Sequence, residues 1–178
     1  MSELDSKSKE INKQSPSLKA RALRLLSLRE YSRQGLATKL EESSKRYAKL
    51  GLKQGQQEGV EVVKPLAVQI EEVLDDFEAR GWLSDQRFAE ALVRRRSERY
   101  GVRKIQDELQ RAGVDSNQAA DLIKGLRETE YQRAKTLWFK KFGVLAQEQK
   151  ERARQYRFLA SKGFSSEVVS KVLGGRVD

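Results

Sequence analysis

The stretch LQRAGV, Leu109 to Val114, decides the fold, because the chain contains two further copies of its pattern. They are FEARGW at Phe77 to Trp82 and LASKGF at Leu159 to Phe164. In each copy an apolar residue is followed by three residues, a glycine and a second apolar residue. Glycine readily takes the left-handed conformation that ends a helix, and the apolar residue after it folds back onto the last turn. The pattern therefore predicts three helix ends of the same kind.

A new helix is predicted after each copy. Ser84, Asp115 and Ser165 follow the three copies, and these residue types cap helix N-termini well. Apolar residues then recur at helical spacing. Their distances from the preceding glycine are the same after the second and third copies and are one residue longer after the first. These positions are Phe88, Ala91 and Leu92, then Ala119, Leu122 and Ile123, and finally Val169, Val172 and Leu173.

The N-terminal part of the chain also has helical periodicity. Ser32 is the expected cap of one helix, and Pro65 suits the first turn of another. Residues 43–64, rich in glycine and glutamine, are expected to form a long loop with a strand-like run at Val60 to Val63. The apolar stripes before and after this loop are formed by Leu18, Ala22, Leu25 and Leu26, and by Leu66, Ile70, Val73, Leu74 and Phe77.

These signals, with further helix ends before Gly101 and Gly143, predict about nine helices. We expect an all-α fold, an elongated tandem array of three three-helix repeats in which each unit buries its apolar stripe against its neighbours. A single irregular helical bundle is the alternative. The expected divisions are a disordered polar tail at 1–16 and helical modules at 17–83, 84–126 and 127–178. The glycines with an expected structural role are Gly81, Gly101, Gly113, Gly143 and Gly163.

Composition favours a binding protein over an enzyme. The 178 residues include 36 Lys and Arg against 26 Asp and Glu, so a net charge of +10 favours polyanionic partners. The chain has no histidine, the commonest general base and metal ligand, and no cysteine for disulfides or thiolate sites. We therefore expect no catalytic residue, cofactor or metal site. Carboxylates that could hold a divalent cation are more simply explained as a solvated helix face: Glu71, Glu72, Asp75, Asp76 and Glu78.

The same composition bears on location. The chain has no apolar run near the length of about 20 residues that spans a bilayer, and its N-terminus lacks the apolar core of a signal peptide. We expect a cytoplasmic protein that does not contact membranes and is a monomer.

Charge alternates along the chain. Residues 61–83 carry two cations and six anions. Residues 84–114 carry eight cations and five anions, and residues 127–163 carry ten cations and four anions. An acidic helix followed by basic modules suggests a surface that recognises a partner carrying both signs of charge.

The densest basic run is RRRSERYGVRK, Arg94 to Lys104, and it is split over several helical faces. By helical geometry Arg95 and Arg99 fall near the stripe of Phe88, Ala91 and Leu92. These two arginines are expected to serve the fold, with Asp75, Asp76 and Glu78 as acceptors. The candidates for contact with a protein partner or nucleic acid are Arg87, Arg94, Arg96, Arg103 and Lys104.

A second basic region lies in the third module. Cations interleaved with aromatic residues suit single-stranded nucleic acid, whose bases stack while its phosphates pair. Helical spacing places Trp138 in the core and Phe139 outside it, so Phe139 is the expected exposed contact. The candidate cations here are Arg133, Lys140, Lys141, Lys150, Arg154 and Arg157.

Several segments resemble the RecX family of regulatory proteins over residues 17–173. They are REYS at Arg29 to Ser32, GWLSDQRFA at Gly81 to Ala89, YG at Tyr100 and Gly101, IQDEL at Ile105 to Leu109, and RFL at Arg157 to Leu159. The resemblance implies tandem three-helix repeats and a protein that binds the RecA recombinase. It further implies a place in the groove of the RecA–DNA filament, inhibition of strand exchange and ATP hydrolysis, and, as in some members, direct DNA binding.

Two functions follow as hypotheses. The leading one is a non-catalytic regulator that binds a RecA-type filament, with single- or double-stranded DNA as a further partner. The other is a direct nucleic-acid-binding protein that inserts a helix-turn-helix, such as Ile105 to Ile123, into a groove. The second helix of that pair carries Lys124 as its one cation, which is poor for a recognition helix.

Overall fold

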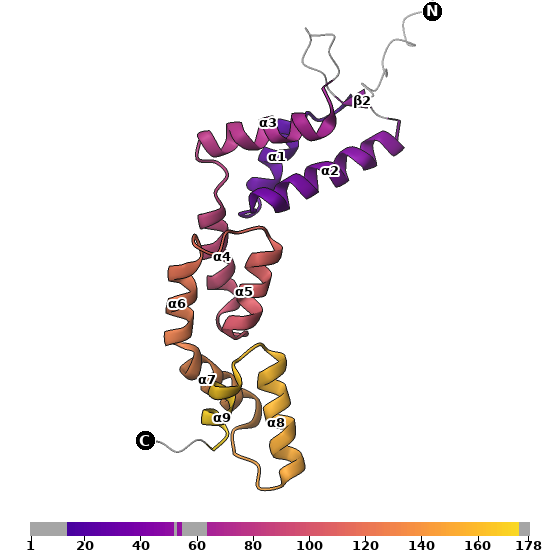
Figure 1. The fold of residues 1–178 in the computed structure, drawn as a ribbon. Coiled ribbons are helices and arrows are strands. Elements are labelled where there is room, and N and C mark those ends of the chain that lie inside the picture. Colours follow the sequence, from indigo (N-terminus) through magenta and orange to yellow (C-terminus); the bar gives the residue numbers. More distant parts are fainter. Residues whose placement is uncertain (1–13, 52, 55–63, 175–178) are drawn as a thin grey trace, which may run out of the picture. The chain divides into compact units, whose positions relative to one another are not determined.

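The computed structural model describes residues 14–51, 53, 54 and 64–174, which form two compact units divided between Ser84 and Asp85 (Figure 1). Nine helices and one pair of two-residue strands lie in this described part of the chain. The predicted all-α class of three-helix repeats is confirmed.

The first unit contains α1 (Leu18–Leu26), α2 (Arg33–Lys49) and α3 (Leu66–Ala79). The strands β1 (Gln14–Ser15) and β2 (Lys53–Gln54) pair in parallel. The apolar stripes of the three helices face one another, and burying them drives the packing of the unit. The buried cluster contains Leu18, Ala22, Tyr31, Leu36, Leu40, Ile70, Val73, Leu74, Phe77 and Leu83.

Local sequence signals explain most boundaries in this unit. The Ser32 hydroxyl accepts a hydrogen bond from the Gly35 N–H at 3.0 Å, as expected of the cap of α2. However, α2 continues to Lys49, so the predicted loop does not begin at residue 43. Ser44 is buried and accepts from the guanidinium of Arg21, itself buried, and this contact keeps the segment helical against α1.

Two other expectations concern the ends of this unit. Ser15 is buried and lies in β1, so the predicted disordered tail does not extend to residue 16. The strand-like run at Val60 to Val63 lies outside the described residues.

The second unit consists of six helices with two buried clusters. One cluster joins α4 (Asp85–Arg96), α5 (Val102–Arg111) and α6 (Ala120–Glu128) around Ala89, Leu92, Ile105, Leu109 and Ile123. The other joins α7 (Glu130–Phe142), α8 (Gln149–Ser161) and α9 (Ser166–Val172) around Ala134, Trp138, Leu159, Phe164 and Val169. Figure 1 shows the two groups of three helices in succession along the chain.

The repeated six-residue pattern forms the same helix end three times. Gly81, Gly113 and Gly163 have positive φ angles of 69°, 77° and 85°. In each copy the N–H of the residue after the glycine donates to the carbonyl of the first residue of the pattern: Trp82 to Phe77, Val114 to Leu109, and Phe164 to Leu159. This is the Schellman arrangement that the pattern predicts.

Gly101 has a different role from these three. Its φ of −77° is ordinary, but its N–H donates to the Lys162 carbonyl at 2.9 Å. A Cβ added to Gly101 would overlap the Gly163 carbonyl and the Phe164 nitrogen, and one added to Gly163 would lie 2.6 Å from Lys104 Cβ. Two glycines therefore allow the start of α5 to lie against the turn between α8 and α9.

This contact predicts the effect of two alanine substitutions. Gly101→Ala should lower the free energy of unfolding by about 1–3 kcal/mol, because its methyl group meets backbone that cannot move aside. Gly125→Ala is the matched control: Gly125 lies inside α6 with nothing within 4 Å of an added Cβ, so alanine should stabilise by up to about 1 kcal/mol. Urea unfolding followed by circular dichroism measures both. Equal stabilities of the two variants would contradict the packing of Gly101 against Gly163.

Candidate interaction surface

Two charged residues of α7 hold the second unit together. Glu130 is only 5% exposed, and its carboxylate accepts from the Val102 N–H at 2.9 Å. It thereby supplies a cap for α5, since the residue at the N-cap position, Gly101, has no side chain.

Arg133 is the second of these residues. Its Nη1 donates to the carbonyls of Ser97 and Tyr100, both at 2.7 Å, and its Nη2 donates to the Leu126 carbonyl at 2.8 Å. Burial lowers the pKa of Arg133, and the neighbouring Glu130 carboxylate opposes that shift. The guanidinium stays charged at neutral pH, and it donates to carbonyl groups at the ends of both α4 and α6.

One of the three carbonyls bound by Arg133 belongs to Tyr100, and three cations lie close to the Tyr100 ring. Lys104 Nζ lies 4.7 Å from the ring centroid, Lys162 Nζ 5.4 Å and the Arg96 guanidinium carbon 5.4 Å. We call Tyr100 and these three cations the Tyr100 cluster. Each cation is placed to interact with the π-system, and the three come from the end of α4, the start of α5 and the end of α8.

One carboxylate belongs to this surface. Glu108 of α5 pairs with Arg96 at 2.9 Å, and the side chain of Glu108 is 23% exposed. Three cations around one ring with one paired carboxylate give a local excess of positive charge. Such an excess attracts an anionic partner and is relieved when one binds.

The structure separates the predicted contact residues into three groups. Arg94, Arg103 and Lys104 are exposed, whereas Arg87 and Arg96 are half-buried. Arg133 is half-buried and bonded to backbone, so it serves the fold and is not a surface contact. The remaining candidates are exposed on α7 and α8: Lys140, Lys141, Lys150, Arg154 and Arg157.

Arg95 and Arg99 differ from the sequence prediction, because both are exposed. The buried side of α4 contains Ala89, whereas the predicted buried stripe contained Ala91. The true stripe is therefore rotated about the helix axis relative to the predicted one, and Arg96 faces inward instead of Arg95. Arg99 lies beyond the end of α4 at Arg96, where helical geometry no longer applies.

The acidic residues of α3 have another partner within their own unit. Arg33 of α2 donates to Glu71, Asp75 and Glu78, and Lys19 pairs with Asp76 at 3.0 Å. Burial disfavours the charged form of Arg33, but the three carboxylates outweigh burial and raise its pKa. Within the described residues, no group of three His, Cys, Asp or Glu side chains is placed to hold a metal ion.

Sequence reasoning missed Lys162 and Glu130. Lys162 stands directly before the glycine of the third repeat, at a helix end where a cation is commonly stabilising, so its position did not mark it as a contact residue. Glu130 had no local signal, because its partner Val102 lies 28 residues away.

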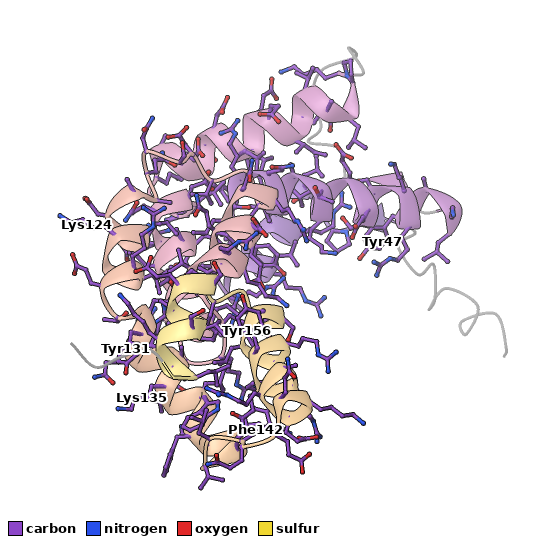
Figure 2. The ribbon with its side chains drawn as sticks, turned by 60° about the horizontal axis from the view of Figure 1, so that its bottom comes forward. Tyr47, Lys124, Tyr131, Lys135, Phe142 and Tyr156 are labelled. Carbon is purple, nitrogen blue, oxygen red and sulfur yellow. The ribbon has the colours of Figure 1, made fainter. Side chains whose placement is uncertain are left out.

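Phe139 is exposed as predicted, with 65% of its surface accessible. On α7 it lies one turn after Lys135 and directly before Lys140, both exposed. Figure 2 shows Lys135 together with Tyr131 at the outer edge of this part of the molecule. Trp138, by contrast, is buried, and its indole N–H donates to Gln155 at 3.0 Å.

Of the helices in the described ranges, none combines the length and the apolar composition that a membrane crossing requires.

Comparison with known proteins relates the chain to a family of regulatory proteins. The model of the second three-helix domain of RecX matches residues 84–123, and that of the third three-helix domain matches residues 128–173. The regulatory protein RecX of Leptothrix cholodnii is 42% identical over 162 residues, 91% of this chain and 90% of that protein. The regulatory protein RecX of Herminiimonas arsenicoxydans is 41% identical over 157 residues, 88% of this chain and 91% of that protein.

A solved structure has a similar fold. The crystal structure of RecX from Lactobacillus salivarius matches 87% of this chain and 91% of its own with a TM-score of 0.60. At 20% sequence identity this likeness concerns the fold alone.

The contacts of Arg133 predict that lysine cannot replace it. Arg133→Lys retains the charge but cannot reach three carbonyls at once, so the free energy of unfolding should fall by about 1–3 kcal/mol. Arg127→Lys, an exposed position on α6, should change it by less than about 0.5 kcal/mol. Urea denaturation of both variants measures the difference, and an Arg133→Lys protein as stable as the control would argue against the bonds described.

Proposed function

The chain belongs to the RecX family of non-catalytic regulatory proteins, which modulate the RecA recombinase, and from this premise we propose that it binds the RecA–DNA filament and inhibits strand exchange and the coupled ATP hydrolysis. The Tyr100 cluster is the feature of the described surface that best supports the proposal. Its excess of positive charge suits an anionic surface, and a filament that contains DNA presents one.

We assign the partner contact to the outer surface of the second unit around this cluster. Arg103 and Lys104 are exposed at the start of α5, and Lys162 extends the same charge from the third three-helix group. Glu130 and Arg133 hold these elements in place, so the cations are positioned before the partner binds. Pre-positioned side chains lose less conformational freedom on binding, which favours affinity.

Direct contact with single-stranded DNA is the second candidate function, and Phe139 favours it. An exposed aromatic ring between Lys135 and Lys140 can stack on a base while the lysines pair with neighbouring phosphates. The helix-turn-helix alternative has less support. The helix α6 extends to Glu128 and therefore carries Lys124 and Arg127, but Asp121 and Glu128 balance these two cations, so the helix is electrically neutral. We further propose that the protein acts in the cytoplasm, since the RecA filament forms on cellular DNA, and that it acts there as a monomer.

Two titrations distinguish these functions. In the first, the protein is added to RecA-mediated strand exchange; in the second, to labelled single- and double-stranded DNA without RecA. We expect inhibition of strand exchange at protein concentrations below that of RecA, and weak DNA binding that falls steeply with salt. Tight DNA binding together with unaltered strand exchange would refute the regulator.

A pair of charge reversals tests the assigned surface. Lys104→Glu with Lys162→Glu should weaken filament binding at least about tenfold, because two favourable charges become unfavourable. Lys124→Glu with Arg127→Glu makes the same change of charge on the exposed side of α6, where Figure 2 shows Lys124 pointing outward. This control should bind within about twofold of the parent. Equal binding by both double variants would move the contact away from the Tyr100 cluster.

A further inference from the structure

A shallow groove lies between α8 and α9, and no residue of the Tyr100 cluster lines it. Its volume is about 540 Å³, and it is lined by Gln149, Arg152, Ala153, Tyr156, Arg157, Ser170, Leu173 and Gly174. Figure 2 shows Tyr156 on the side of α8 that faces α9. We call this hollow the α8–α9 groove.

Side chains of α8 form one wall of the groove because they share a helical face. Gln149, Arg152, Ala153, Tyr156 and Arg157 recur at intervals of three and four residues. The small side chain of Ala153 leaves the middle of this wall hollow, and a larger residue there would fill the space.

A hydrogen bond from Arg152 joins this wall to the end of α9. The Nη2 of Arg152 donates to the Leu173 carbonyl at 2.9 Å, and a Cβ on Gly174 would lie 2.7 Å from the same nitrogen. Glycine at 174 thus makes room for the guanidinium. The bond uses one of the five N–H groups of the guanidinium and holds its charge at the edge of the groove.

The lining has a defined chemistry. Ala153, the ring of Tyr156 and Leu173 provide apolar surface, and Arg152 and Arg157 provide two positive charges. Among the eight residues that line the groove, none is acidic. A volume within the usual range of about 300–1,000 Å³ for ligand sites accommodates one or two large side chains.

An acidic protein segment fits this chemistry better than nucleic acid does. Nucleic-acid strands are held by a track of several cations that follows successive phosphates, whereas this groove offers two arginines beside aliphatic surface. A bulky apolar side chain can occupy the groove while neighbouring carboxylates pair with the two guanidinium groups, which bind carboxylates in bidentate fashion.

We infer that the α8–α9 groove is a docking site for a short acidic segment of a partner protein that carries at least one large apolar side chain. It provides a second contact, separate in chemistry from the Tyr100 cluster, with the partner bound by that cluster. The inference rests on the proposed function only for the identity of this partner, a protein of the recombinase filament.

The test uses the full chain and a defined probe. The probe is a fluorescein-labelled peptide of alternating glutamate and aspartate with a central leucine–phenylalanine pair, and binding is followed by fluorescence anisotropy. We expect saturable binding by the parent protein. A second peptide, with serine in place of both apolar residues, should bind at least about tenfold more weakly, because charge alone does not fill the groove. Equal binding of the two peptides would overturn the inference.

Two variants change the groove and one matched variant does not. Ala153→Trp fills the hollow, and Arg157→Glu reverses a charge at its edge; each should weaken peptide binding at least about tenfold. Lys171→Glu makes the same charge change on a residue of α9 that does not line the groove, and its side chain is 59% exposed, so binding should stay within about twofold. Circular dichroism checks the fold of each. Loss of binding in all three, or in none, would overturn the assignment to the groove, as would tighter binding of an oligothymidylate than of the peptide.

The same proteins in the strand-exchange assay separate this inference from the proposed function. Peptide binding by a parent protein that leaves strand exchange unaltered would support the groove and refute the regulator. Inhibition of strand exchange by a parent protein that does not bind the peptide would support the regulator and refute the groove.

Discussion

The backbones of Gly101 and Gly163 lie so close that neither residue can carry a side chain, and the second unit depends on this contact. The Gly101 N–H donates to the Lys162 carbonyl, so the start of α5 and the end of α8 form a single junction. Because of that junction, Lys104 and Lys162 both lie close to the Tyr100 ring although 58 residues separate them. A close backbone approach between two helical groups thus brings cations that are distant in sequence to one aromatic ring.

Charged residues in this protein have two kinds of role, and their hydrogen-bond partners distinguish them. Glu130 is buried and Arg133 half-buried, and each bonds to backbone groups at helix ends that have no partner within their own helix. In the first unit Arg33 joins three carboxylates of α3 to α2. The cations that remain exposed, such as Arg103 and Arg157, are available to a partner because these buried and paired groups already stabilise the helices.

The two proposed contacts differ in chemistry and therefore in what they can discriminate. The Tyr100 cluster is dominated by charge, and charge steers association and responds to salt. The α8–α9 groove combines apolar surface with two arginines, so it can distinguish one acidic segment from another by the side chain that enters it. A regulator that must act on one filament among many polyanions in the cell benefits from having both.

Sequence alone determined the features that depend on neighbouring residues: the helix ends at Gly81, Gly113 and Gly163, the apolar stripes, the cap at Ser32 and the exposure of Phe139. Each of these is set by helical geometry or by bonds within six residues, which is why the repeats could be recognised without a structure. The same reasoning wrongly assigned Arg95 and Arg99 to the fold: Arg95 because Ala91 was placed in the buried stripe instead of Ala89, and Arg99 because α4 ends at Arg96. Only the tertiary structure decided which charges meet: Glu130 with Val102, Arg133 with three carbonyls, and Lys162 with Tyr100. These partners lie up to 62 residues apart, and local periodicity carries no information about contacts between helices that pack only after the chain has folded.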